Sequence, residues 1–361
     1  MSSAKSVRIV RNFVADPWKS MHRYADEIIS AVKARSAGLD IKVYQPPGSL
    51  LSLGTTLGRR ILLPAVAERS PVDVVHILDQ AYADLLLHSK AAAKIITCHD
   101  LEFWRQKKFW NAPVRNRIFE GVTSADAIVV PAKTIRDELV ALKPTLFSRI
   151  HVVPNGVPAD FTPATRESRA ALRLELDLGA DFVCLHVGTS ELPRKNVAFL
   201  FEALAHLKAK GISVRLIQAG GKFTPEQYRL LAKSGLLSVT TELGRIGDES
   251  LKKWYRAADA VLVPSLYEGF GLPVLEAMAC GTPVVCSDIA VFNEITEGTG
   301  VALALVPDLW AQRLLILQKS EEARAKAIET GVRTAARFTY SNAGIQLTEI
   351  YRAIEPPVSR R

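Results

Sequence analysis

Two glutamates, Glu268 and Glu276, lie eight residues apart in a segment rich in small and apolar residues, 265–283. Gly269 and Gly271 between them allow a backbone to approach a ligand closely. The N–H groups at the start of a following helix suit a phosphate, whereas carboxylates accept hydrogen bonds from hydroxyls. An anion site between two hydroxyl acceptors matches a nucleoside diphosphate joined to a sugar. The same residues also fit a plain capped helix after a glycine turn, and spacing alone does not separate the two interpretations.

The elements around this segment predict where it lies in a fold. Residues 260–264 have the pattern of a short buried strand, and 284–286 that of another. Between them, Pro273 favours a helix start and Gly281 a helix end, which predicts a helix of about eight residues. A strand, a turn, a helix and a second strand form a right-handed crossover in a parallel sheet. The turn at 268–271 is therefore expected at the carboxyl edge of the sheet, where such sheets bind ligands.

A pair of cations, Arg194 and Lys195, follows another predicted strand at residues 182–187. Asn196 is expected to cap the helix that comes next, and Gly211 to end it. Cations beside the free amides of a helix N-terminus bind phosphate well. The alternative interpretation is a basic turn that is only solvated.

The glutamate segment resembles the retaining glycosyltransferases of family 4, whose hallmark is two glutamates separated by seven residues. Here the hallmark stands as Glu268-Gly-Phe-Gly-Leu-Pro-Val-Leu-Glu276, followed by Ala-Met-Ala-Cys-Gly-Thr-Pro-Val-Val. The resemblance covers most of the chain from His99 onward and is densest across 186–288. It implies an α/β fold of the GT-B type, with two doubly wound Rossmann-like domains facing across a cleft. In that family the C-terminal helix crosses back to the N-terminal domain.

Strands alternate with helices along the chain, which independently predicts doubly wound domains. Residues 154–163 are rich in proline and include Pro-Asn-Gly-Val, which occupies the hinge position in the resembled family. We therefore expect an N-terminal Rossmann-like acceptor-binding domain at 1–160 and a C-terminal Rossmann-like nucleotide-sugar-binding domain at 161–337. A crossover helix and tail are expected at 338–361.

The resemblance also assigns roles to residues. The implied catalytic residues are Glu268, Arg194, Lys195 and His99, and the implied donor-binding residues are Gly188, Arg245, Ile246, Phe270, Gly271, Leu272 and Glu276. Arg194, Lys195 and the helix amides would stabilise the departing diphosphate. Glu276 would accept hydrogen bonds from the ribose hydroxyls. Glu268, with the backbone of 270–272, would hold the sugar.

Two further roles depend on the register of the resemblance. The loop that carries Arg245 and Ile246 would face the nucleobase. His99 and Asp100 stand at the end of a predicted strand, 95–98. An imidazole there can hydrogen-bond a hydroxyl of the transferred sugar, and the alternative is a histidine satisfied by a backbone carbonyl.

The acceptor side is expected on the N-terminal domain, at His22, Arg23, Trp104 and Arg105. A loop is predicted at 11–22, before a helix from Tyr24, and it lacks the paired glycines that commonly reach the donor diphosphate in the resembled family. Aromatic and basic residues interleave across 103–110. That mixture suits a membrane interface, stacking on an acceptor sugar, or a loop packed by its own aromatic rings.

The resemblance implies a retaining hexosyltransferase that uses a nucleotide-diphosphate sugar and a saccharide or lipid-linked acceptor, in polysaccharide or glycolipid synthesis. GDP-mannose is favoured over a UDP-sugar because Tyr-Glu-Gly-Phe-Gly-Leu-Pro, residues 267–273, is common among mannosyl- and related transferases. No Asp-x-Asp triplet occurs, so fixed cations rather than a metal are expected to neutralise the diphosphate, and no cofactor is expected. The alternative is a non-catalytic nucleotide-sugar- or glycan-binding relative. An oxidoreductase is disfavoured because no Gly-x-Gly-x-x-Gly follows an early strand.

Composition limits the partners. The chain has 361 residues, 48% of them hydrophobic, and a net charge of +9. Residues 1–160 hold 22 Lys and Arg against 15 Asp and Glu, so most of the excess lies in the N-terminal part. This predicts peripheral contact with an anionic membrane, and the lack of any nucleic-acid-binding signature argues against nucleic acid. Without an apolar run of membrane length or a signal peptide, we expect a cytoplasmic protein at the inner face of the plasma membrane. Four cysteines without zinc spacing are expected to be buried thiols.

Overall fold

The computed structural model of the chain describes residues 4–12, 19–45, 72–105, 112–190, 192–299 and 301–355. The chain divides into two compact units. Unit 1 comprises Met1–Gly156 with Thr339–Arg361, and unit 2 comprises Val157–Phe338. The divisions thus fall after residues 156 and 338, where the sequence predicted 160 and 337.

Unit 1 is built on a parallel six-stranded sheet with the strand order β2-β1-β3-β4-β5-β6. The strands are β1 (Lys5–Val10), β2 (Leu39–Tyr44), β3 (Val74–Ile77), β4 (Ala93–Thr97), β5 (Ala127–Val130) and β6 (Ile150–Val152). The helices are α1 (Lys19–Lys33), α4 (Glu102–Arg105), α5 (Ala112–Ser124), α6 (Lys133–Leu142) and α15 (Tyr340–Ala353), and two 3₁₀ segments span Gln80–His88 and Pro144–Arg149. β3, β4 and β5 are buried along their whole length, as expected for parallel strands covered on both faces.

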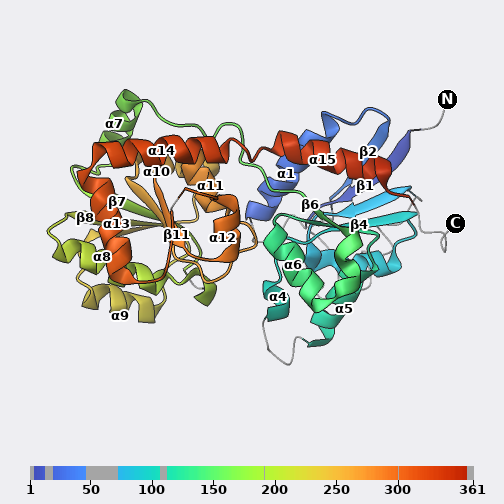
Figure 1. Cartoon of the computed structure of the whole chain (residues 1–361), viewed down its shortest axis with the longest axis horizontal. Helices are drawn as coiled ribbons and strands as arrows, with labels where there is room; N and C mark the ends of the chain where they lie inside the picture. Colours follow the sequence, from blue (N-terminus) through green and yellow to red (C-terminus); the bar gives the residue numbers. More distant parts are fainter. Residues whose placement is uncertain are drawn as a thin grey trace. The chain divides into compact units, whose positions relative to one another are not determined.

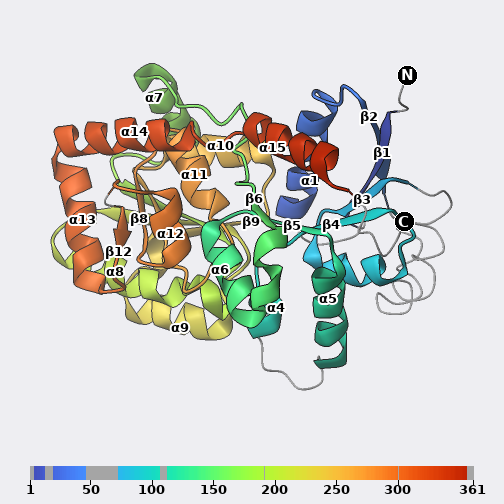
Figure 2. The same cartoon turned by 45° about the vertical axis from the view of Figure 1, so that its right-hand side comes forward.

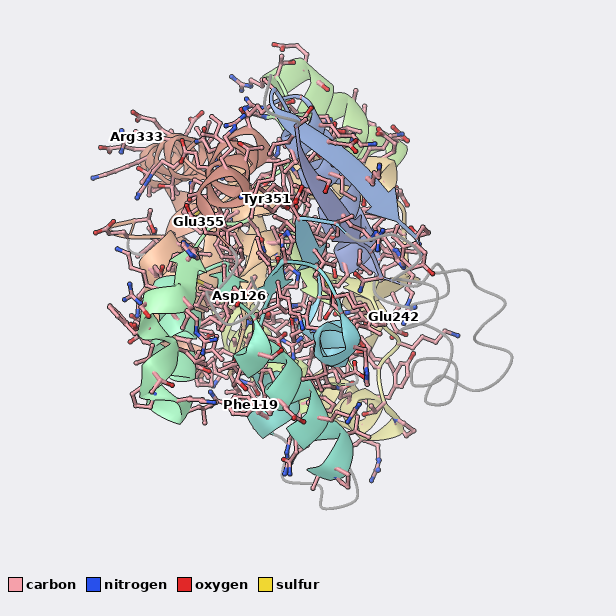
Figure 3. The ribbon with its side chains drawn as sticks, turned by 90° about the vertical axis from the view of Figure 1, so that its right-hand side faces the viewer. Phe119, Asp126, Glu242, Arg333, Tyr351 and Glu355 are labelled. Atoms are coloured by element: carbon pink, nitrogen blue, oxygen red, sulfur yellow. The ribbon has the colours of Figure 1, made fainter. Side chains whose placement is uncertain are left out.

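The last helix, α15, packs on α1 within unit 1, and both Figure 1 and Figure 2 show the two helices side by side. The contact is close, because a Cβ on Gly344 would lie 2.8 Å from the carbonyl carbon of Ala31. Tyr351 of α15, labelled in Figure 3, places its Oη 2.6 Å from Nδ1 of the buried His76 on β3. The expected return of the C-terminal helix to the N-terminal domain is confirmed.

Unit 2 contains a second parallel six-stranded sheet, with the order β12-β11-β10-β7-β8-β9. Its strands are β7 (Phe182–Gly188), β8 (Val214–Gly220), β9 (Thr240–Gly244), β10 (Ala260–Val263), β11 (Val284–Ser287) and β12 (Ala302–Leu303). Its helices are α7 (Arg166–Glu175), α8 (Val197–Ala209), α9 (Pro225–Lys233), α10 (Asp248–Ala257), α11 (Leu272–Ala279), α12 (Ala290–Ile295), α13 (Pro307–Lys319) and α14 (Glu321–Ala335), with 3₁₀ segments at Pro193–Lys195 and Leu237–Val239. Two parallel sheets, each with helices packed around it, confirm the predicted fold class.

Helices cover this second sheet on both faces. One face forms a core with α8, α9 and α13, in which Leu200, Leu231 and Trp310 pack against strand residues such as Leu216 and Leu262. Helices α10 and α11 contact each other and lie on the other side of the strands (Figure 2). The strand order places β7 between β8 and β10, so the loops after these three strands open on the same carboxyl edge of the sheet.

Several local predictions differ from the structure. Helix α1 begins at Lys19, so His22 lies on a helix and not in a loop. The sequence also places residues 164–168 in the linker and the start of a helical region at Glu294. Instead, helix α7 begins at Arg166 and helix α12 at Ala290. All four cysteines are free and buried, as predicted. The sequence also predicts an apolar helix near 55–68, which lies outside the described residues, as does the tail after 355. None of the helices in the described ranges has the length and apolarity that crossing a membrane requires.

Candidate functional site: a buried ion cluster at the sheet edge

The turn between β10 and α11 has the conformation that its glycines suggest. Gly271 adopts φ +110°, and a Cβ there would lie 2.7 Å from Cε1 of Phe292, so a side chain fits neither the backbone nor the space. Helix α11 then runs for eight residues, as predicted from Pro273 and Gly281. The amides of residues 270–272 donate to no group in the described part of the chain, whereas the amide of Val274 already donates to the Gly271 carbonyl. The unpaired donors are therefore the amides of Phe270 and Gly271, just before the helix, and of Leu272, its first residue.

Glu268 lies in this turn and pairs with both predicted cations. Its Oε1 is 2.5 Å from Nζ of Lys195, and its Oε2 is 3.0 Å from Nη1 of Arg194. The Ser265 hydroxyl donates to Oε1 over 2.7 Å. The side chains of Glu268 and Lys195 are each only 10% exposed. Three residues predicted separately, Glu268, Arg194 and Lys195, thus form one buried ion cluster together with Ser265. We call these four residues the Glu268 cluster.

The electrostatics of the cluster favour the ionised carboxylate. Burial by itself raises the pKa of Glu268, but the charges of Lys195 and Arg194, with hydrogen bonds from Lys195 and Ser265, lower it to about 2. Both cations also keep donors in reserve. Lys195 makes one hydrogen bond with three available N–H groups, and Arg194 uses only Nη1, which donates to Glu268 and to the Tyr267 carbonyl. Within the described residues, the other N–H groups of both side chains have no partner and can bind an anion.

The loop after β7 positions the two cations. Residues Pro193–Lys195 form a 3₁₀ turn, and the Arg194 carbonyl accepts a 2.7 Å hydrogen bond from the amide of Leu266, which ties this loop to the turn after β10. The predicted role of Asn196 is wrong: its side chain makes no capping hydrogen bond. Instead, Asn196 adopts a left-handed conformation with φ 49°, which ends the 3₁₀ turn and begins α8.

Glu276 lies on α11 and belongs to a different environment. It is 1% exposed, and its Oε2 accepts a 2.9 Å hydrogen bond from Oη of Tyr255 on α10. It makes no ion pair with Arg194 or Lys195. Its predicted contact with ribose hydroxyls stays a prediction.

The remaining donor-side residues border the same sheet edge. Gly188 ends β7, and a Cβ on it would lie 3.5 Å from Cε of Lys195, so its backbone passes directly beside the cluster. Arg245 is exposed and Ile246 is half-buried in the loop after β9. Phe270 is buried against Phe338, with ring centroids 5.8 Å apart, while its backbone keeps an unpaired amide.

Sequence reasoning did not assign roles to three polar residues of this region: Ser265, His186 and Gln218. His186 on β7 and Gln218 on β8 are fully buried neighbours in the sheet register. Nδ1 of His186 is 2.8 Å from the Leu262 carbonyl, and its Nε2 has no partner within the described chain. Burial lowers the pKa of His186 to about 4, so its ring is neutral at neutral pH. Polar residues inside otherwise apolar strands were the signal that could have identified them.

In unit 1, His99 follows β4 and is buried, and its amide donates to Oε1 of Gln80 over 2.8 Å. Its Nε2 is 2.8 Å from the Leu78 carbonyl, which can only accept, so Nε2 carries the proton. Its Nδ1 is buried and has no partner in the described residues. The ring of Tyr24 packs edge-on against the imidazole with centroids 4.6 Å apart. The Nε2 contact matches the alternative of a histidine satisfied by a backbone carbonyl. The hydrogen bond of His99 to a sugar hydroxyl stays a prediction, for which Nδ1 is the nitrogen still available.

The ring of Tyr24 is in turn the end of a chain of hydrogen bonds that starts on α15. Tyr351 contacts Nδ1 of His76, Nε2 of His76 is 2.8 Å from Oγ1 of Thr97, and Thr97 hydrogen-bonds Tyr24. All of these side chains are buried. We call this set (Tyr351, His76, Thr97 and Tyr24) the neutral chain of unit 1, because burial lowers the pKa of His76 to about 3 and raises that of Tyr24 to about 12.

The predicted acceptor residues occupy two separate elements of unit 1. His22 and Arg23 lie half-buried near the start of α1. Trp104 on α4 packs edge-on against Phe119 of α5, which is labelled in Figure 3, with centroids 5.5 Å apart. Arg105 pairs with Glu138 over 3.5 Å. Phe103 also lies edge-on to Trp104, with ring centroids 6.5 Å apart. Residues 106–111 lie outside the described chain, and the three interpretations of 103–110 stay predictions.

Comparisons with known proteins give relatives for both units. The model for Glycosyltransferase Family 4 matches residues 14–161, and the model for Glycosyl transferases group 1 matches 181–329. The chain is 29% identical over 242 residues to the O-antigen chain mannosyltransferase B of Escherichia coli, covering 66% of this chain and 63% of the relative. It is 34% identical over 241 residues to a D-inositol 3-phosphate glycosyltransferase of Xylanimonas cellulosilytica, covering 64% and 57%. These matches span less than two thirds of either relative.

A solved structure extends the likeness to the whole fold. Anabaena HepE, in complex with UDP-glucose, superposes with a TM-score of 0.77 at 17% identity, covering 97% of this chain and 100% of that one. Identity at this level shows a shared architecture and nothing finer. Since the two family models match most of the chain and its two Rossmann-like units have the GT-B architecture, the protein belongs to the family 4 glycosyltransferases.

Proposed function

We propose that the protein is a retaining glycosyltransferase that moves a hexose from a nucleotide-diphosphate sugar to a saccharide or lipid-linked acceptor. The observation that carries the proposal is the Glu268 cluster beside the unpaired amides of residues 270–272, in a chain of this family. Unused N–H groups of two cations and free backbone amides suit the diphosphate. A carboxylate in the same turn suits the sugar hydroxyls.

The cluster also limits which group can move the acceptor's proton. A side chain whose pKa is about 2 stays ionised at neutral pH, and it is a weak proton acceptor. Glu268 therefore binds and orients the sugar in this proposal. The bond from the anomeric carbon to the diphosphate oxygen breaks, the acceptor oxygen bonds to that carbon from the same face, and the diphosphate oxygen takes the acceptor's proton. Configuration at the anomeric carbon is then retained.

Charge on the leaving diphosphate is offset by protein groups in this proposal. Arg194 and Lys195 supply two positive charges, and the start of α11 supplies amides and the positive end of its dipole. We therefore expect transfer to continue after treatment with EDTA. Loss of transfer in EDTA that magnesium restores would show that a metal supplies this charge.

The donor and acceptor are proposed from the relatives. A mannosyltransferase of O-antigen chains among them supports GDP-mannose and a saccharide acceptor, while the UDP-glucose complex of HepE makes a UDP-sugar the competing donor. We further propose that the protein works in the cytoplasm, where the excess basic charge of residues 1–160 contacts anionic lipid at the inner face of the membrane. Salt-sensitive sedimentation with anionic but not neutral vesicles is the expected result.

Two assays test the function. A thermal-shift screen with GDP-, UDP- and dTDP-sugars should raise the melting temperature with one nucleotide class, because a ligand that binds only the folded state stabilises it. Transfer of labelled sugar from that donor, followed by NMR of the product's anomeric proton, then reports activity and stereochemistry. A donor that binds but is neither transferred nor hydrolysed would identify a non-catalytic relative. An inverted product would refute retention.

A further inference from the structure

Both oxygens of Glu268 are engaged by cations in the structure. Lys195 holds Oε1 and Arg194 holds Oε2, and these are the same two side chains to which the proposed function assigns the diphosphate. The inference below rests on that assignment. Two cations and one carboxylate leave the cluster with only one net positive charge. A diphosphate that binds there meets cations already partly neutralised by the protein's own anion.

A diphosphate at this position also places new negative charge close to a buried carboxylate. The side chain of Glu268 is only 10% exposed, so water screens little of the repulsion between the two anions. Despite its burial, the charges of Lys195 and Arg194 lower the pKa of Glu268 to about 2, so the carboxylate is ionised at neutral pH when the ligand arrives. The spare N–H groups of Lys195 and Arg194 can bind the phosphate, and the positive charge of each cation is then shared between two anions. A bare nucleoside diphosphate therefore binds against an opposing charge.

An intact donor differs from that product by its sugar, and the sugar carries hydroxyl groups. Hydroxyls donate to carboxylates, and hydrogen bonds to a charged acceptor are among the stronger ones in proteins. Hydrogen bonds from the sugar's hydroxyls can thus stabilise the Glu268 carboxylate while Lys195 and Arg194 share their charge with the diphosphate. When the sugar has been transferred, the compensation is lost while the diphosphate remains. The opposing charge then favours release of the product.

We propose that Glu268 sets the preference of the site for the intact nucleotide-sugar over the free nucleoside diphosphate, by acting as an internal anion that only the sugar's hydroxyls compensate. This specificity role is separate from orienting the sugar for reaction. It predicts that removing the negative charge strengthens binding of the product, although the same change should harm transfer.

The test is a comparison of dissociation constants by isothermal titration, with UDP and GDP against UDP-glucose and GDP-mannose, in the absence of acceptor. In the wild-type protein we expect the donor to bind at least about tenfold more tightly than its diphosphate. In Glu268→Gln we expect the diphosphate to bind about tenfold more tightly than it does to wild type, and the ratio between the two ligands to approach about one. Gln keeps the side-chain shape and an acceptor for Ser265, but it has no charge.

Glu276→Gln is the matched control, because it makes the same chemical change in the other glutamate of the pair. Glu276 has no ion pair with Arg194 or Lys195, and its proposed partner, ribose, is common to both ligands. We expect it to weaken the binding of both ligands equally and to leave the ratio of their dissociation constants unchanged. Ser265→Ala should act in the opposite direction to Glu268→Gln. It removes the Ser265 hydrogen bond to Oε1, so the carboxylate depends more on Lys195 and Arg194. The dissociation constant of the diphosphate divided by that of the donor should therefore rise about two- to threefold.

The outcomes separate this inference from the proposed function. If the wild-type protein binds no nucleotide ligand, the function and the inference both fail. If it binds both ligands and Glu268→Gln weakens the diphosphate or leaves the ratio at its wild-type value, only the inference fails. Should Glu268→Gln not fold, an unchanged or lowered ratio in Ser265→Ala overturns the inference on its own.

Discussion

The two units surround their candidate site residues with different kinds of polar group. In unit 2, Glu268 lies between Arg194 and Lys195, and every member of that set carries a full charge. In unit 1, His99 lies at the end of a chain of neutral groups, from Tyr351 through His76 and Thr97 to Tyr24. Charged groups suit a phosphate, and an imidazole suits a sugar hydroxyl.

This difference between charged and neutral groups also predicts how the stability of each region responds to substitution. A buried ion cluster is stable only when complete, because removal of one partner leaves an uncompensated charge in a site that water hardly reaches. A neutral chain loses one ordinary hydrogen bond when a member is changed. Substitutions in the Glu268 cluster should therefore cost more than substitutions in the neutral chain of unit 1, and the four predictions below follow that order.

The largest effect is expected from Lys195→Ala. It removes a cation from both the diphosphate and Glu268, so we expect transfer to fall at least about a hundredfold and stability to fall by about 3 kcal/mol. Lys253→Ala is the control, because Lys253 forms an exposed pair with Glu175 that should contribute less than about 1 kcal/mol. Steady-state transfer rates and urea unfolding measure the two effects. Transfer within a few-fold of wild type would show that the Glu268 cluster is not the site.

The second prediction concerns the backbone beside the cluster. Gly271→Ala should lower stability by about 2–3 kcal/mol, because φ +110° is strained for a residue with a side chain and the new Cβ meets Phe292. Gly247→Ala is a matched control at another helix start: its φ is −82° and nothing lies within 4 Å of a Cβ there. That change should alter stability by less than about 0.5 kcal/mol. Equal costs at the two glycines would refute the conformational argument.

The third prediction separates the units by pH. The folded pKa of His76, about 3, lies below its ordinary 6.5, so the unfolded chain takes up the proton first and stability is lost as pH falls from 6.5 toward 3. For Glu268 the folded pKa of about 2 lies below 4.5, so its contribution is lost only as pH falls below 4.5. Between pH 7 and 5, His76→Gln should lose about 2 kcal/mol less stability than wild type.

Glu268→Gln provides the comparison for that experiment. Over the same interval it should lose about as much stability as the wild-type protein, since the carboxylate that the substitution removes stays largely ionised from pH 7 to 5 in both the folded and the unfolded wild-type chain. Urea unfolding at the two pH values gives both differences. A wild-type-like slope in His76→Gln would mean that the buried imidazole already carries its proton in the folded protein.

The smallest effect is expected from Tyr351→Phe. It deletes the hydroxyl that contacts His76 and keeps the ring in the core, so stability should fall by about 1 kcal/mol and transfer should change less than about twofold. A loss of transfer beyond tenfold in the folded variant would show that the neutral chain of unit 1 controls His99 and does more than hold α15 in place.

Local sequence signals predicted most of the elements of the fold. Thr224-Pro-Glu-Gln227 has the sequence of a capping box, and this box forms at the start of α9. Helix α11 has its expected length because proline and glycine fix both of its ends. The start of α1 was misplaced because residues 19–23 show little apolar periodicity before Tyr24. Asn196 was misassigned because the same residue type favours both a side-chain cap and a left-handed backbone.

The site was predictable as a set of residues and not as a network of contacts. A parallel sheet brings the ends of neighbouring strands together, so Lys195 and Glu268 were expected on one edge although 73 residues separate them. Which atoms pair depends on loop dihedral angles and on Ser265, and a sequence pattern does not encode these at such distance. Likewise, no sequence pattern predicted the contact of His76 with Tyr351, because the two residues are 275 positions apart.

The position of α15 has a consequence for synthesis on the ribosome. Tyr340, Leu347 and Tyr351 belong to the same core as β1 and α1, which emerge from the exit tunnel hundreds of residues earlier. Unit 2 leaves the tunnel as one continuous segment and can fold while unit 1 still waits for its final helix. During that interval the apolar face of α1 is uncovered, so nascent chains should engage chaperones through the N-terminal unit, although it was translated first.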